Sequence, residues 1–364
     1  MWMQYFEQFL DRQFVRFLNE KPWNYKDDLC VIGGHDLALA TGDAVWDSYA
    51  RRYAEHLMDA EGNIQNWKAT ESNIDKVSFG KSLMILRDLT GDERYAEAVR
   101  RVYATLAPYP RTVTGNFWHK SIYPNQVWLD GLYMGMPFYA RVLDETGADG
   151  WDDILDQFQS AHKLLWDERL GLYMHACDCS REAEWADPVT GRSPSVWLRA
   201  EGWFLMALCD TYELAVKHTT RAPELSALLK NALDGILKYQ VPETKMLLQV
   251  VDRADVPGNY SETSGSAMVA YALMKGARLG MLPAAYGDRG SELLDGIRDT
   301  YLRREADGIH LYGICASAGL GPGPDHRTDR TGTVAYYLSE KQMTDNQHGA
   351  AACMMAVSEQ LLRR

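Results

Sequence analysis

The sequence predicts an all-α protein built as an (α/α)6 barrel, a closed double ring of helices. Three observations lead to this expectation: a helical phrase that recurs along the chain, further helical runs between its copies, and no convincing series of alternating strands. Paired helices can stack into an open solenoid or close into a ring. Because the repeats are long and the irregular loops are rich in Trp, His and Asp, we expect a closed ring. Its loops should gather at one end around a pocket, and one domain spanning residues 1–364 should hold the whole ring.

The recurring phrase occupies residues 41–57 (TGDAVWDSYARRYAEHL) and 90–106 (TGDERYAEAVRRVYATL), with a looser copy at 145–165. The first two copies begin 90 − 41 = 49 residues apart, a spacing typical of one helical hairpin per repeat. A Thr or Asp near the start of each copy can cap a helix. In the second copy, Tyr95 and Val99 lie on one apolar stripe, as in an amphipathic helix.

The remaining segments complete the expected helical pattern. Further helices are expected at residues 73–89, 126–143, 196–217, 222–240, 262–279 and 345–362. Short stretches at 246–251 and 309–316 can pair locally as strands, and GLGPGP at 319–324 reads as a turn-rich loop.

The charge balance excludes some classes of partner. Thirty-eight basic and fifty acidic side chains give a net charge of −12, which argues against a nucleic-acid binder and against adhesion to anionic membranes. A locally basic pocket can still bind a small anion. The amphipathic N-terminal segment lacks the features of a signal peptide, so we expect a cytoplasmic protein. The six scattered cysteines are expected to be reduced and mostly buried, with no metal site.

The densest candidate site is the segment 115–136, GNFWHKSIYPNQVWLDGLYMGM, which contains His119, Lys120 and Asp130. Asp130 interrupts an apolar run, so it either faces a cavity or caps a helix. Apolar surroundings would raise its pKa and suit it to donate a proton. Asp75, in SNIDKVSFGKSL, reads by itself as a helix cap, but two carboxyls in one pocket push each other's pKa values apart.

Three further candidates follow later in the chain. His175, in GLYMHACD, is either a structural hydrogen-bonding group or a site residue. In VWLRAEGWF, a helix beginning near Arg199 would direct Trp197 and Arg199 into a pocket mouth. Arginine is suited to clamp a carboxylate, and flat indole faces suit sugar rings. Trp203 reads equally well as a core residue. No P-loop, GxSxG or HExxH motif is present.

Together these segments resemble the unsaturated rhamnogalacturonyl hydrolases, glycoside hydrolase family 105. FWHKSIYPNQVWLDGLYMGMPF at 117–138 is similar to the central signature of that family, and the resemblance spans nearly the whole chain. It continues in order through NID at 73–75, GLYMHACD at 171–178, WADPVTGRSPSVWLRAEGWF at 185–204 and GNYSETSGSAM at 258–268.

The resemblance implies an (α/α)6 barrel that acts on oligosaccharides left by pectin lyases. Their non-reducing end carries a 4,5-unsaturated galacturonic acid linked to rhamnose. Asp130 falls on the general acid/base of the family and Asp75 on a second carboxylate. Sugar and carboxylate contacts fall on His119, Lys120, His175, Trp197, Arg199 and Trp203, and Tyr25 falls on an N-terminal pocket tyrosine. No metal or cofactor is implied, the partner is a small oligosaccharide, and we expect a monomer or weak homo-oligomer.

The chain departs from the family pattern at two places. His348 stands where a lysine is expected, and CDCSREAE at 177–184 is unusual beside His175. Three other functions stay open. An unsaturated glucuronyl hydrolase acting on glycosaminoglycan or ulvan fragments would share the chemistry, although the acidic loop argues against sulfated aglycones. A sugar epimerase would use His175 and His348 but leave the WLDG motif unexplained. A non-catalytic helical scaffold would leave the His, Lys and Asp cluster unexplained.

Overall fold

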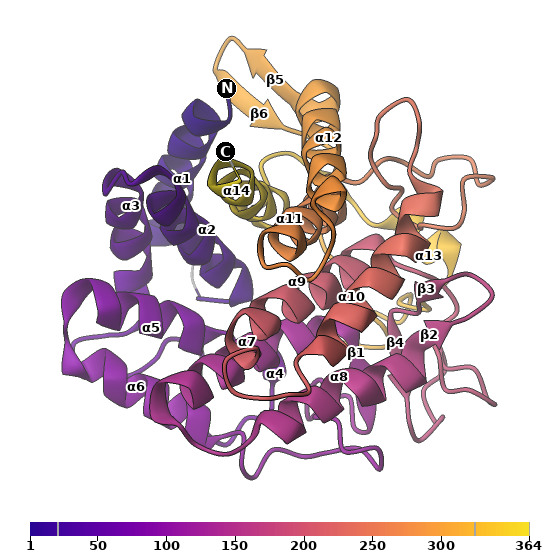
Figure 1. The fold of residues 1–364 in the computed structure, drawn as a ribbon, viewed down its shortest axis with the longest axis horizontal. Coiled ribbons are helices and arrows are strands. Elements are labelled where there is room, and N and C mark those ends of the chain that lie inside the picture. The colour runs from indigo at the N-terminus through magenta and orange to yellow at the C-terminus, as the bar shows by residue number, and fades with distance from the viewer. Residues whose placement is uncertain (20–21, 324, 364) are drawn as a thin grey trace.

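A computed structural model describes residues 1–19, 22–323 and 325–363. Its helices form two concentric rings, which Figure 1 shows nearly end-on. Each inner helix packs against the next, and the last packs against the first, so the ring is closed. The inner ring consists of α2 (Tyr25–Thr41), α4 (Ile74–Val77) with α5 (Phe79–Thr90), α7 (Leu129–Thr146), α9 (Leu198–Ala215), α11 (Thr263–Arg278) and α14 (Gln347–Leu362). The predicted (α/α)6 barrel is confirmed.

The outer ring covers the inner one. It consists of α1 (Trp2–Asn19), α3 (Val45–Ala54), α6 (Glu93–Ala104), α8 (Trp151–Leu165), α10 (Pro223–Ile236) and α12 (Ala284–Tyr301). Outer helices bury one stripe; α6, for example, buries Tyr95 and Val99 as predicted. Inner helices such as α9 and α11 are buried on almost every face, because they contact both neighbouring inner helices and the outer layer. The short helix α13 (Val334–Ser339) and the 3-10 turns η1 (Glu55–Leu57) and η2 (Leu237–Tyr239) complete the helical elements of the described residues.

The recurring phrase has a different role from the one predicted. Its first residues end an inner helix instead of starting an outer one. Thr41 donates its hydroxyl to the carbonyl of Leu37, and Gly42 follows in the left-handed conformation at φ +71°. Thr90 with Gly91 and Thr146 with Gly147 repeat this geometry. A left-handed glycine stops a helix, so the Thr of each copy ends a helix and does not cap the next one, as the sequence would have allowed. Asp92 does cap α6, as expected.

Eight short strands pair into four antiparallel ribbons. They are β1 (Gln126–Trp128) with β4 (Ala176–Asp178), β2 (Trp166–Asp167) with β3 (Leu172–Tyr173), β5 (Leu302–Glu305) with β6 (Gly308–Leu311), and β7 (Ile314–Cys315) with β8 (Gln342–Met343). The sequence predicted residues 126–143 as helix throughout, but the first three residues form β1. Their partners lie about fifty residues further on, with Gln126 opposite Asp178, and local periodicity cannot reveal such a partner.

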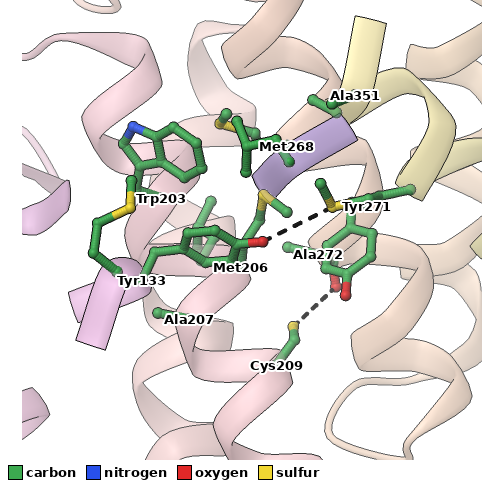
Figure 2. Close-up of a cluster of buried hydrophobic side chains, with 14 of the residues drawn as sticks. Tyr133, Trp203, Met206, Ala207, Cys209, Met268, Tyr271, Ala272 and Ala351 are labelled. Atoms are coloured by element: carbon green, nitrogen blue, oxygen red, sulfur yellow. Dashed lines mark hydrogen bonds between the residues drawn. The ribbon is translucent and has the colours of Figure 1, made fainter. Parts of the chain in front are cut away.

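The core lies inside and between the two rings. Figure 2 shows one part of it, where Tyr133, Trp203, Met206 and Met268 pack together. The cysteines are unpaired, and all are buried except Cys179, which is partly exposed. Within the described residues, no helix is long and apolar enough to cross a membrane.

Gly235 gives a stability test of the contact between α10 and the β2–β3 turn, the ribbon that leads to His175. A Cβ at Gly235 would collide with the carbonyl oxygen of Gly171. We expect Gly235→Ala to lower the free energy of unfolding by about 1–3 kcal/mol, measured by urea denaturation. Gly34→Ala is the matched control, because a Cβ at Gly34 would lie 3.4 Å from its nearest neighbour, the Cβ of Ala50, which is an ordinary contact distance. Equal stability of the two variants would contradict this packing.

Candidate active site

The site is built from the first turns of the inner helices. Asp130 and Arg199 each occupy the second residue of their helix, α7 and α9, after the matching pairs Trp128–Leu129 and Trp197–Leu198. Asp75, Ser264 and His348 hold the same position in α4, α11 and α14. Hydrogen bonds join several of these residues across neighbouring helices, so the helix starts converge at one end of the barrel. Helix N-termini carry partial positive charge, and their convergence favours an anionic ligand.

Asp130 is held by His175. The β1–β4 ribbon and a backbone hydrogen bond from Leu129 to the carbonyl of His175 bring the two together. His175 Nε2 lies 3.2 Å from Asp130 Oδ2, and its Nδ1 lies 2.7 Å from the Tyr337 hydroxyl. An ionised carboxylate can only accept, so His175 Nε2 carries a proton and donates to Asp130.

The pKa of Asp130 differs in direction from the sequence-based expectation. Burial, the largest single contribution, raises it, but the attraction and hydrogen bond of His175, together with His119, more than offset that effect. The net result is a pKa below the ordinary value. The free site therefore holds Asp130 as a carboxylate at neutral pH. A bound anion would raise this pKa again, because like charges disfavour the charged form.

Asp75 is paired with Lys120. Lys120 Nζ lies 2.6 Å from Asp75 Oδ2, and His119 Nε2 lies 3.9 Å from Asp75 Oδ1. Asp75 does not cap α4. Asn73 does, because its side chain accepts a hydrogen bond from the Asp75 amide. Burial lowers the pKa of Lys120, but Asp75 raises it by more, so the ammonium stays charged.

His119 belongs to a stack of flat rings. Its ring lies 4.4 Å from that of Trp128 at an angle of 9°, and Tyr123 stacks on the same indole at 5.1 Å. Burial lowers the pKa of His119 to about 4, so the imidazole is neutral at pH 7. It can therefore donate or accept one hydrogen bond to a ligand without adding charge.

Arg199 is a buried cation without an acidic partner. Its side chain stacks over Trp197 at 4.7 Å, and its NH1 donates to Ser264 Oγ at 3.0 Å and to the Cys315 carbonyl at 2.7 Å. No carboxylate of the described residues lies within ion-pair distance, and Nε has no hydrogen-bond partner there. The buried carboxylate of Glu262 reaches Arg199 only through the Ser264 hydroxyl that both residues bond. A buried guanidinium without a direct ion pair is costly unless an anion compensates it, so this residue points to a negatively charged ligand group.

His348 lies beside Tyr25 at the wall where the sequence departs from the family pattern. Tyr25 Oη is 2.9 Å from His348 Nε2, and His348 Nδ1 is 3.0 Å from Asn346 Oδ1. Burial, then the charges of Arg199 and Lys26, lowers the pKa of His348 well below its ordinary value. His348 is therefore uncharged, whereas a lysine at this position would add a positive charge to the site.

The structure gathers most of the predicted side chains into one cluster. Trp203 differs, because its ring packs in the core, beside Tyr25 and 4.9 Å from the ring of Tyr133 (Figure 2). Tyr337 has only a weak signal in the sequence, in the segment VAYYLSE. Gln249, which accepts from Trp197 Nε1 and donates to the Tyr337 carbonyl, has none. A lone glutamine in a loop has no local pattern that would single it out.

One group outside this cluster has the spacing of metal ligands. Glu305, Asp307 and His310 lie together at the β5–β6 hairpin, with both acids exposed. Both ring nitrogens of His310 already bond to carboxylates, of Asp345 and Asp307. Exposed acids of this kind are common without a metal, and the hairpin contributes nothing to the cluster around Asp130.

The closed double ring gathers carboxylates, histidines and an arginine at one end, as expected for a glycoside hydrolase of the (α/α)6 class. The profile of Glycosyl Hydrolase Family 88 matches residues 1–363. A glycoside hydrolase from family 105 of C. acetobutylicum superposes with a TM-score of 0.90 at 36% identity, covering 98% of this chain and 99% of that one. The chain belongs to glycoside hydrolase family 105, within the wider family 88 group.

Other relatives are similar over shorter stretches or only in fold. A 24.9 kDa protein in the picA locus of Rhizobium radiobacter is 39% identical over 235 residues, 63% of this chain and 99% of that protein. The unsaturated rhamnogalacturonyl hydrolase YesR of Bacillus subtilis is 28% identical over 216 residues, 57% of this chain and 59% of YesR. An unsaturated glucuronyl hydrolase from Bacillus sp. GL1 shares the fold, with a TM-score of 0.69 at 16% identity, covering 98% and 96% of the two chains.

Proposed function

We propose that this enzyme removes a 4,5-unsaturated galacturonic acid from the non-reducing end of oligosaccharides derived from rhamnogalacturonan, where the uronic acid is linked to rhamnose. The observation that carries the proposal is Arg199, a buried guanidinium with no carboxylate of the described chain to pair with. The carboxylate of a uronic acid supplies the missing charge, and the converging helix starts add to its attraction. The similarity to YesR supports the galacturonyl-rhamnose linkage.

The chemistry follows from the enol ether of the unsaturated ring. Asp130 donates its proton to C4, and the C4=C5 electron pair forms the new C–H bond. The resulting cation at C5 is stabilised by the ring oxygen. Water then attacks C5 and returns a proton to Asp130, which gives a hemiketal. The hemiketal opens to a 5-keto sugar, and the C1 centre releases the aglycone alcohol. One water is consumed, and the proton on Asp130 is restored.

The neighbouring residues support this cycle. The negative charge of the bound uronate would raise the pKa of Asp130 and favour its protonated form, although Arg199 limits that effect. His175 orients the carboxyl through Nε2. Asp75, fixed by Lys120 at 2.6 Å, is suited to hold the attacking water. The ordinary rules that relate carboxylate separation to stereochemistry do not apply, because the bond broken first is not at the anomeric carbon.

The experiment that tests the proposal follows the conjugated double bond by ultraviolet absorbance. We expect the unsaturated galacturonyl-rhamnose disaccharide to lose absorbance while free rhamnose appears in equal amount. Loss of absorbance only on unsaturated glucuronyl disaccharides would replace the proposed substrate. No loss on either disaccharide would reject uronyl hydrolysis. In keeping with the substrate, we propose a small oligosaccharide as the only partner the site requires and a cytoplasmic location.

A further inference from the structure

A groove beside the active site is not used by the chemistry described above. Its volume is about 550 Å³, which is within the range of small-molecule sites. Three segments line it: residues 122–126 leading into β1, residues 178–185 leading out of β4, and residues 321–322 with 328–331. The second of these holds most of the unusual CDCSREAE segment.

One aromatic layer separates the groove from the catalytic carboxylates. Tyr123 lines the groove and stacks on Trp128, which in turn stacks on His119. Lys120 Nζ, the partner of Asp75, lies 5.9 Å from the centre of the Tyr123 ring. The groove therefore lies one aromatic layer from the residues that would hold the uronic acid.

The groove offers aromatic surface and free acceptors. Trp185 lines it together with Tyr123, and the apolar face of a sugar ring packs on such rings. Two of its charged residues are already engaged. Asp178 accepts hydrogen bonds from the Ser180, Glu182 and Ala183 amides, and both ends of the Arg330 guanidinium bond to Asp325 at 2.8 and 2.6 Å.

Glu182 and Glu184 are different, because both are exposed. Neither side chain has an ion pair or hydrogen bond within the described part of the chain. A carboxylate can only accept hydrogen bonds. It therefore binds sugar hydroxyls and repels a sulfate or a second carboxylate. The one cation among the described lining residues, Arg330, is paired with Asp325, although its buried Nε has no hydrogen-bond partner there.

We infer that this groove binds the aglycone sugar and selects an uncharged one, with Glu182 and Glu184 rejecting sulfated or carboxylated sugars. The inference rests on the proposed function and adds to it the residues that decide which aglycone is accepted. On this inference, the negative charge of the loop 178–185 favours a neutral deoxyhexose as the aglycone and disfavours sulfated sugars.

The test compares two unsaturated uronyl disaccharides, one with a rhamnose aglycone and one with a 6-sulfated hexosamine. We expect the Glu182→Lys/Glu184→Lys double variant to shift the ratio of their kcat/KM values by about tenfold toward the sulfated substrate. The shift should shrink as salt is added. If the sulfated compound is not turned over, its inhibition constant against the neutral substrate gives the same comparison.

Glu61→Lys/Glu243→Lys is the matched control, because both glutamates are exposed and the change in net charge is the same. We expect this control to keep the wild-type ratio. An unchanged ratio in the groove variant, with turnover of the neutral disaccharide intact, would overturn the inference but leave the proposed function standing. Failure of the wild-type enzyme to cleave either disaccharide would reject both.

Discussion

Replacing Asp130 with asparagine is expected to lower kcat by about 10²–10⁴-fold, the range for loss of a general acid/base. We expect the upper end, because Asp130 both donates the proton to C4 and takes one from water. Asparagine keeps an oxygen that accepts from His175 Nε2, so the local geometry and KM should change little. The measurement is the initial rate of absorbance loss at saturating disaccharide.

The control lies at the other end of the same helix. Asp144→Asn makes the identical change near the C-terminal end of α7, where Asp144 pairs with His218, and should retain wild-type kcat. Circular dichroism would show that both variants fold. An Asp130→Asn variant with more than a tenth of the wild-type kcat would contradict the assigned role.

The pH dependence of the wild-type enzyme follows from the same residue. The pKa of Asp130 lies below its ordinary value in the free enzyme, so its protonated fraction grows as the pH falls toward that pKa. We expect kcat/KM, which reports the free enzyme, to rise as the pH is lowered below 7 until folding is affected. Asp130→Asn should lose this dependence.

Replacing Arg199 is expected to weaken binding of the uronate. Truncating one partner of a buried, hydrogen-bonded charge pair costs about 2–5 kcal/mol, which corresponds to an increase in KM of roughly 30-fold or more. Arg199→Lys should recover part of the loss, because it keeps the charge but not the planar fork. Arg199→Met tests the loss of charge with less disturbance of packing than alanine.

A change in the substrate separates this effect from misfolding. The methyl ester of the unsaturated uronate lacks the negative charge, so wild-type enzyme should bind it about as poorly as Arg199→Met binds the acid. Arg199→Met should in turn bind acid and ester alike. If the variant still preferred the acid as strongly as the wild type does, Arg199 would not be the carboxylate clamp.

The helical class could be predicted from the sequence because the signal is local. Apolar residues at helical spacing, such as those of the segment 90–106, identify an amphipathic helix without reference to the rest of the chain. The boundaries were less accurate. Thr90 and Gly91 end α5, yet the same residues are compatible with a helix start, and only the preceding helix decides between the two.

The residues of the cluster could be named from motifs, but their electrostatics could not. The phrase WLD at Asp130 and the phrase WLR at Arg199 mark two similar helix starts. The expectation of a raised Asp130 pKa failed because it considered only the apolar neighbours in the chain. His175, forty-five residues away, lies 3.2 Å from the carboxylate and reverses the direction.

The sequence by itself determined the helical architecture, the family, and the residue types available for catalysis, since periodicity and motifs are properties of neighbouring residues. Only the tertiary structure decided which side chains meet. It left Arg199 with no carboxylate of the described residues at ion-pair distance, paired Asp75 with Lys120, and placed Trp203 in the core. The physical reason is that charge pairing, desolvation and pKa depend on distances through space, and ring closure sets those distances between residues far apart in the chain.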